Sequence, residues 1–131
     1  MTSEMIVPKG QGWAPRDFHM APAMTANGMV WMSGVVATQT EEGPEAMEAA
    51  MVKAFETIAG TLQAAGSDMD HVVDIMSYHT DLDAQMSTFM RVKDRFLPGP
   101  KFPCWTGIGI TSLAVPPAIC EIKIVALQKT G

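Results

Sequence analysis

Residues 101–125 read KFPCWTGIGITSLAVPPAICEIKIV, and this stretch decides the fold class. It predicts two strands near the end of the chain, at 105–110 and 120–126, because β-branched and apolar residues are dense on both sides of the segment SLAVPP. Side chains alternate between the two faces of a strand. In the second strand every even position is apolar and suits a covering layer of helices: Cys120, Ile122, Ile124 and Ala126.

The face turned away from the helices is expected to carry the polar groups of this segment. Alternation places Glu121 there, and we expect Trp105, Gly107 and Gly109 of the preceding strand on the same face. Glycine in a strand costs stability and often marks the close approach of a ligand or of another backbone. The face therefore predicts a cleft lining or a tight subunit contact. The alternative is that Glu121 pairs with Lys123 on a solvated surface.

Two helices are predicted by apolar spacing and by signals at their ends. Residues 41–66 place apolar side chains three and four positions apart in one stripe, and Pro44 suits the first turn of this helix. Residues 84–96 predict a second helix, which Asp81 or Asp83 can cap. Each helix has an apolar stripe to bury, so both are expected to pack on a sheet.

The remaining strands complete that sheet. Asn27 and Gly28 supply the positive φ angles of a tight hairpin turn, and residues 71–80 predict a single strand. The order predicts an α+β fold, a mixed β-sheet with two helices on one face. We expect one domain over residues 1–131, with residues 1–17 as an N-terminal extension or loop. The helix-free face would stay wet unless another subunit covers it, so a homo-oligomer is expected.

Composition argues against several classes of protein. With 47% hydrophobic and 18% charged residues, the chain is expected to be globular, and its net charge of −5 argues against nucleic acid as a partner. Two cysteines and no export signal favour free thiols in a cytoplasmic protein over a single disulfide. No apolar run is long enough to cross a membrane. The three histidines lack the spacing of metal ligands, so no metal site is expected.

Taken together, these segments resemble the Rid/YjgF family of reactive-intermediate deaminases, formerly called the endoribonuclease L-PSP family. The similarity begins at about Phe18 and covers nearly all of the following chain. It rests on the order and spacing of several stretches: ANGMVWMSGVV, AFETIAGTLQAAGSDMDHVVDIMSYHTDL, the FP pair at 102 and 103, GIGITSLA and ICEIKIVAL.

The resemblance implies a chorismate-mutase-like fold and a homotrimer with a cleft between each pair of adjacent subunits. It implies hydrolysis of reactive imines and enamines, such as 2-aminoacrylate, without a metal or organic cofactor. In the active members an arginine after a Pro-Ala pair holds the substrate carboxylate, whereas this chain reads Pro103-Cys104-Trp105 and so resembles a subgroup without that arginine. An indole cannot neutralise a carboxylate, so Trp105 is expected to select an aromatic or uncharged ligand, and 2-aminoacrylate is not the expected substrate.

The resemblance also implies the residues of the site. Glu121 matches the family glutamate that, together with the backbone carbonyl of Gly107, positions a water molecule. Ser33 and Gly34 match the pair that lines the cleft. Arg16 could swing in from its loop to replace the missing guanidinium. Further ligand contacts are assigned to Trp105, Trp31, Met20 and Phe18.

The leading hypothesis is therefore a cytoplasmic homotrimer that binds a small organic metabolite in each intersubunit cleft. It would hydrolyse an imine, an enamine or a related molecule through a water held by Glu121. The alternative is a trimer that binds or senses a small molecule without turnover. A third function, endoribonuclease or translation inhibitor, is attached to some relatives and is disfavoured by the acidic composition.

Overall fold

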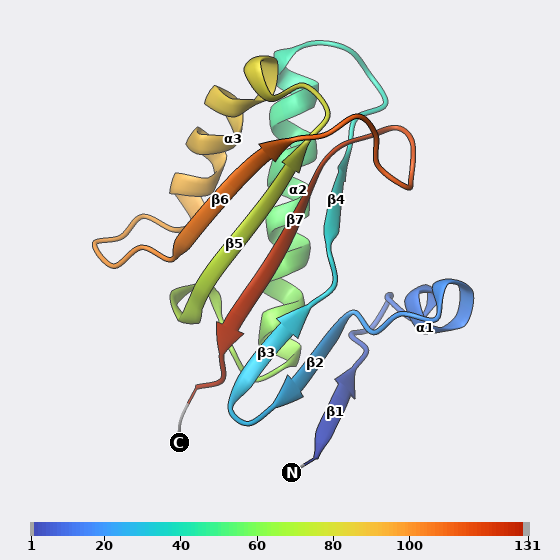
Figure 1. The fold of residues 1–131 in the computed structure, drawn as a ribbon, viewed down its shortest axis with the longest axis vertical. Helices are drawn as coiled ribbons and strands as arrows, with labels where there is room; N and C mark the ends of the chain where they lie inside the picture. Colours follow the sequence, from blue (N-terminus) through green and yellow to red (C-terminus); the bar gives the residue numbers. More distant parts are fainter. Residues whose placement is uncertain (1, 130–131) are drawn as a thin grey trace.

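The computed structural model describes residues 2–129, and a seven-stranded mixed sheet is its central feature (Figure 1). The strands are β1 (Ser3–Ile6), β2 (Ala23–Ala26), β3 (Met29–Met32), β4 (Val35–Thr38), β5 (Val72–His79), β6 (Cys104–Gly109) and β7 (Ala118–Leu127). Neighbouring strands follow the order β1-β2-β3-β7-β5-β6, and β4 pairs with a second part of β7. The expected α+β fold is confirmed.

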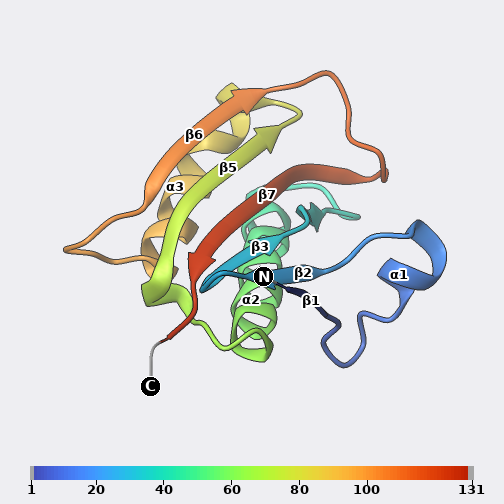
Figure 2. The same ribbon diagram turned by 60° about the horizontal axis from the view of Figure 1, so that its bottom comes forward.

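Two long helices, α2 (Pro44–Ala64) and α3 (Leu82–Phe96), cover the same face of the sheet, as Figure 2 shows. Both were expected from the sequence, and their ends follow the expected signals. Pro44 begins α2, where its missing N–H costs no helical hydrogen bond. The side chain of Asp81 caps α3 by accepting a hydrogen bond from the backbone N–H of Ala84 at 3.2 Å.

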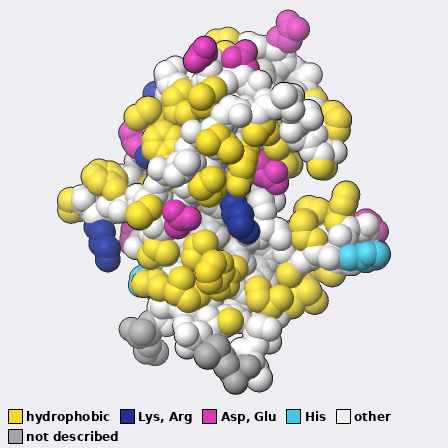
Figure 3. Space-filling model, in the orientation of Figure 1, with side chains coloured by type: hydrophobic (Ala, Val, Ile, Leu, Met, Phe, Trp, Pro, Cys, Tyr) yellow, Lys and Arg dark blue, Asp and Glu magenta, His cyan; other side chains and the backbone are white. Residues whose placement is uncertain are grey.

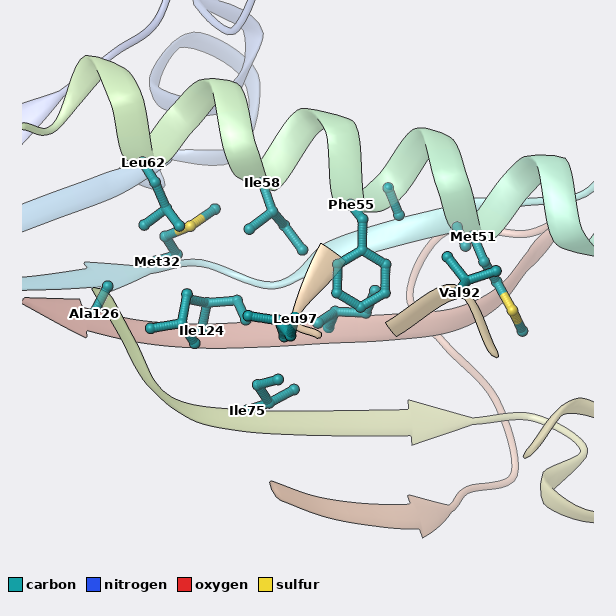
Figure 4. Packing of buried hydrophobic residues seen from close by; sticks show 14 of the residues in the cluster. Met32, Met51, Phe55, Ile58, Leu62, Ile75, Val92, Leu97, Ile124 and Ala126 are labelled. Atoms are coloured by element: carbon teal, nitrogen blue, oxygen red, sulfur yellow. The ribbon is translucent and has the colours of Figure 1, made fainter. Parts of the chain in front are cut away.

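The core lies between these helices and the sheet. Figure 4 shows the apolar stripe of α2 pointing at side chains of β3, β5 and β7. The two helices meet through aromatic rings, with the Phe55 centroid 5.8 Å from that of Phe89 and 5.2 Å from that of Phe96. Full burial of one such side chain contributes about 1.5–3 kcal/mol, so this layer is the main source of stability for the fold.

The line of β3 and β4 is interrupted at residues 33 and 34. Trp31 pairs with Val125 and Val35 with Ile122, so an extra residue stands on the β3–β4 side of the ladder. Such an irregularity bends the strand and re-aims the side chains beside it. The expected hairpin before this point is confirmed, because Asn27 and Gly28 have φ angles of 52° and 76°.

The N-terminal segment is more ordered than expected. Residues 1–17 were predicted to form an extension or loop, but β1 pairs with β2 as an edge strand, and helix α1 (Trp13–Phe18) follows. Pairing with an existing sheet edge supplies the backbone hydrogen bonds that so short a strand cannot supply alone. No helix within residues 2–129 has both the length and the apolar character needed to cross a membrane.

The sequence predicted the wrong face of the sheet for the side chains of β6. The neighbouring strand β5 shows this: Ile75 is a core residue on the helix-covered face, and it pairs with both Ile124 of β7 and Trp105 of β6. Trp105 and, by alternation, Gly107 and Gly109 therefore lie on the helix-covered face, while Glu121 lies on the open face.

The two glycines of β6 lie against closely packed neighbours. A Cβ atom at Gly107 would lie 3.0 Å from Ser77 Oγ of β5, which is tighter than ordinary packing, and 3.4 Å from the Met86 side chain of α3. A Cβ atom at Gly109 would lie 3.5 Å from the Leu82 side chain of α3, an ordinary van der Waals contact. The apolar Ile108 is instead 39% exposed on the open face.

Candidate functional site

A pocket of about 600 Å³ lies where α1, the interruption at residues 33 and 34, and the start of β7 approach α2. It is lined by five of the residues that the sequence predicted for the site: Phe18, Met20, Ser33, Gly34 and Glu121. Three others lie elsewhere, namely Trp31, Trp105 and Gly107. The pocket volume lies within the range of about 300–1,000 Å³ that is usual for small-molecule sites.

Glu121 packs against the backbone of Gly34. A Cβ atom at position 34 would overlap the carboxylate, lying 2.6 Å from Cδ and 2.8 Å from Cγ of Glu121 and still closer to Oε2. The φ angle at Gly34 is not positive, so the absence of a side chain, rather than an unusual backbone conformation, is what this position requires. Gly34 therefore permits the observed position of the carboxylate.

Ser33 fixes the backbone beside that contact. Its hydroxyl donates to the carbonyl oxygen of Ala21 at 2.6 Å, and its backbone N–H donates to the carbonyl of Pro22 at 3.1 Å. These two hydrogen bonds join the end of β3 to the residues that precede β2. The hydroxyl proton of Ser33 is thus used in the hydrogen bond to Ala21, and the Ser33 oxygen can act only as an acceptor towards the pocket.

Lys123 stabilises the interruption from the open face. Its ammonium group donates to the carbonyl oxygen of Met32 at 2.6 Å. The alternative considered from the sequence, an ion pair between Glu121 and Lys123, is not formed. Within residues 2–129, no cation lies within ion-pair distance of Glu121. The Glu121 carboxylate is therefore left available to a ligand or to water.

Trp105 belongs to a buried hydrogen-bonded chain on the opposite face. Its indole N–H donates to Ser77 Oγ at 2.9 Å, and the same oxygen lies 2.8 Å from Nε2 of the fully buried His79. The ring also packs on Phe89, with centroids 5.9 Å apart, and the Lys93 ammonium lies 4.8 Å from the Trp105 centroid. The expectation that Trp105 and Glu121 border one hollow is therefore wrong within a single chain.

His79 is buried in a way that disfavours its charged form. Its Nδ1 atom has no hydrogen-bond partner among the described residues, and the ring meets Phe89 edge to face, with centroids 4.8 Å apart. Burial lowers the pKa of His79, and the nearby Gln85 side chain offsets part of this effect without reaching hydrogen-bond geometry with Nδ1. His79 thus has a structural position in the core.

Trp31 and Arg16 lie outside the pocket. Trp31 is 48% exposed on the open face of β3, where it pairs with Met24 and Val125. The Arg16 guanidinium pairs with the Asp17 carboxylate at 2.9 Å on the surface, which lowers the pKa of Asp17. Arg16 therefore does not supply the guanidinium that the sequence lacks at position 105.

The pocket also contains residues that the sequence did not indicate. Gln11 and Trp13 from the N-terminal segment, Lys53 from α2 and Val115 from the loop before β7 also line it. The aromatic residues around α1 could have indicated this wall of the pocket, but residues 1–17 were predicted to be an extension or loop and were not considered as part of the site. The sequence did not indicate Lys53 as a pocket residue, because a lysine on a helix usually points into solvent.

The two cysteines are free thiols on opposite faces of the sheet. Burial, with a smaller effect of the neighbouring Glu121, raises the pKa of Cys120 to about 12, so this thiol is not a nucleophile at neutral pH. Cys104 is exposed on β6. Within the described residues, no three His, Cys, Asp or Glu side chains come close enough together to hold a metal ion.

Comparison with known proteins decides the family. The family model described as endoribonuclease L-PSP matches residues 15–128. The chain is also 31% identical over 122 residues to the RutC family protein YjgH of Escherichia coli, covering 92% of each chain. The chain belongs to the Rid/YjgF (endoribonuclease L-PSP) family.

Solved structures agree with this assignment to the Rid/YjgF family. A structure of protein YjgH superimposes with a TM-score of 0.85 at 28% identity and covers all of both chains. NMB1025, a YjgF family member from Neisseria meningitidis, gives a TM-score of 0.80 at 24% identity and covers 100% of this chain and 98% of its own. Rv2704 of Mycobacterium tuberculosis gives 0.81 at 19% identity, covering 96% and 99%. The last two matches support the fold alone.

Proposed function

We propose that this Rid/YjgF protein binds a small organic metabolite in the pocket beside Glu121 and hydrolyses an imine, an enamine or a related molecule there. The observation that carries the proposal is the Glu121 carboxylate held over Gly34, with no ion-pair partner among residues 2–129. A carboxylate within hydrogen-bond reach of a water molecule can act as a general base. Membership in the family supports the reaction class.

The proposed reaction needs only water, the substrate and one carboxylate. Glu121 accepts a proton while the water oxygen forms a bond to the carbon of C=N. The nitrogen gains a proton, and the resulting carbinolamine then loses ammonia as the C–N bond breaks and a carbonyl group forms. Ser33 contributes by keeping Gly34, and through it Glu121, in place. Gly107 lies in the edge strand β6, with β5 between it and β7, and it does not line the pocket, so its backbone carbonyl could join this site only from another subunit.

The proposal includes a homotrimer, as the resemblance implies, located in the cytoplasm, as the cysteine content and the expected lack of an export signal suggest. Figure 3 shows hydrophobic side chains spread over the open sheet face, with few charged groups between them. Four large apolar residues there are 39–50% exposed: Met5, Trp31, Ile108 and Leu127. Covering such a face with identical subunits would remove it from water. Light scattering coupled to gel filtration tests the assembly, and Trp31→Glu should reduce the measured mass to that of the monomer.

The reaction is tested with imines and enamines generated in place from amino acids. The wild-type protein should speed release of ammonia over buffer, and Glu121→Gln should abolish the increase. Glu42→Gln, an exposed carboxylate outside the pocket, is the matched control and should retain full activity. The proposal fails if Glu121→Gln is as active as the wild type or if no imine reacts faster than in buffer.

The second candidate is a ligand-binding protein without turnover. It is favoured by the hydrogen bond of the Ser33 hydroxyl to Ala21, which leaves Glu121 as the single candidate general base among the pocket-lining side chains within residues 2–129 that carries a carboxylate. This alternative predicts saturable binding of a small molecule with no product formed. Calorimetry combined with the ammonia assay separates the two candidates.

A further inference from the structure

One wall of the pocket beside Glu121 is aromatic and open. This wall, named the α1 wall, consists of Trp13, Phe18, Met20 and Val115. The rings of Trp13 and Phe18 meet edge to face with centroids 5.8 Å apart, yet the two residues remain 43% and 59% exposed. An aromatic pair that is left open beside a cavity offers apolar surface that a ligand can cover.

The α1 wall is held in place by contacts of its backbone and of its neighbours. Ala14 is buried, and its carbonyl accepts a hydrogen bond from the backbone N–H of Met20 at 3.2 Å, which closes the end of α1. Gln11, just before α1, donates from its side chain to Thr61 Oγ1 of α2 at 2.7 Å. The aromatic side chains are therefore carried by an anchored segment, which lowers the entropy lost when they bind a ligand.

The pocket has two opposite charges in its lining, Lys53 and Glu121. Lys53 is exposed on α2, and within residues 2–129 no carboxylate lies within ion-pair distance of it. A ligand with an acid group and a protonated C=N nitrogen would match both charges. Such a ligand would find in Lys53 the cation that position 105 lacks.

From these features the geometry points to 2-imino acids with an aromatic side chain as the preferred substrates. This inference rests on the proposed hydrolysis and adds the class of substrate. The acid group meets Lys53, the C=N group lies beside Glu121, and the ring covers the α1 wall. Water adds to the C=N carbon, the nitrogen takes up a proton, and the C–N bond breaks to release ammonia and an aromatic 2-oxo acid.

The first experiment varies the charge of the pocket. Imines of phenylpyruvate, pyruvate and acetophenone provide an aromatic acid, a small acid and a neutral aromatic compound. The wild type should prefer the aromatic acid over each of the other two by about tenfold or more in kcat/KM. Lys53→Gln should remove the preference over the neutral compound, Lys53→Arg should restore it, and Lys101→Gln, outside the pocket, should change nothing. Equal loss for the acid and the neutral compound overturns the role of Lys53.

The second experiment removes the ring surface. Phe18→Ala should lower kcat/KM for the aromatic acid by about tenfold and leave the small acid almost unchanged. Phe102→Ala is the matched control, because Phe102 is 64% exposed and lies outside the pocket. If Phe18→Ala affects both acids equally, or if the wild type prefers the small acid, the aromatic class is wrong.

A binding measurement separates this inference from the proposed function. Calorimetry with phenylpyruvate, the stable product, needs no turnover. If phenylpyruvate binds in a Lys53-dependent manner but no imine is hydrolysed, the hydrolytic function fails and the ligand class stands. If imines are hydrolysed but phenylpyruvate and pyruvate bind equally well to wild type and Lys53→Gln, the ligand class fails and the function stands.

Discussion

The carboxylate of Glu121 fills the space that a side chain at position 34 would occupy, so Gly34 and Glu121 form one structural unit. The Cδ and Cγ atoms of Glu121 lie 2.6 Å and 2.8 Å from the position of a Cβ atom on Gly34. Ser33 holds the same backbone through its hydrogen bond to Ala21. The position of the proposed general base thus depends on a residue with no side chain of its own.

Gly34→Ala should displace the Glu121 carboxylate without unfolding the protein. The new methyl group meets a side chain that can move, so the cost to stability is small, but a misplacement of about 1 Å can cost about 100-fold in rate. We expect kcat/KM for imine hydrolysis to fall to that extent. Gly60→Ala is the control: its Cβ would contact nothing within 4 Å, so it should keep full activity and gain about 0.5–1 kcal/mol of stability. Full activity in Gly34→Ala would refute the coupling.

Lys123→Met should destabilise the fold through the interruption between β3 and β4. The substitution removes the donor to the carbonyl oxygen of Met32 and keeps most of the apolar stem. Because Lys123 is exposed and water can replace it, we expect a loss of only about 1 kcal/mol in the free energy of unfolding. Urea denaturation followed by circular dichroism measures it, with Lys101→Met as the exposed control. A loss no larger than that of the control would contradict this role.

Much of the fold could be predicted because local signals and tertiary contacts agree. Pro44 and Asp81 mark helix starts, and Asn27-Gly28 forces a hairpin, whatever the surroundings. β6 is different, since its pairing with β5, and no local signal, sets which of its residues face the helices. An apolar strand residue normally faces the helices, but in β6 Gly107 lies against the Ser77 hydroxyl of β5 and Gly109 against Leu82 of α3, while Ile108 faces outward.

The candidate site was predicted in part for a similar reason. Phe18, Met20, Ser33, Gly34 and Glu121 line the pocket as expected, because all five lie near or within the matched segments. The charge of Lys53 and the ring of Trp13 join them only because the segment before α1 is hydrogen-bonded to α2, which leaves no periodic pattern in the sequence.

Trp105→Phe should lower stability and leave catalysis unchanged, because the indole donates its N–H to Ser77 in the core. Loss of this hydrogen bond costs about 1 kcal/mol. Ser77→Ala should cost more, about 3 kcal/mol, since it leaves both the indole N–H and His79 without their partner. Ser87→Ala, exposed on α3, should stay within about 0.5 kcal/mol of the wild type. A raised KM in a fully stable Trp105→Phe variant would instead indicate a ligand contact.

The buried His79 should make the fold less stable in mild acid. Burial holds the pKa of His79 below its ordinary value of about 6.5, so the folded protein keeps the ring neutral while the unfolded chain takes up a proton. Below about pH 6.5 the unfolded state therefore binds more protons, and the free energy of unfolding falls as pH falls, by at most about 1.4 kcal/mol per pH unit from this residue. The decline from His79 stops once pH drops below its pKa in the folded state.

His79→Gln tests this because glutamine does not titrate and can still hydrogen-bond to Ser77. Urea denaturation of both proteins between pH 5 and pH 8 gives the difference in stability at each pH. Contributions from the ion pair of His71 with Asp68 are common to both proteins and cancel in that difference. We expect the variant to be the less stable protein at pH 8, where the neutral His79 packs on Phe89, and to close the gap as pH falls. A difference that does not change with pH would mean that His79 gains no proton on unfolding, and the burial of its neutral form would then be the wrong description.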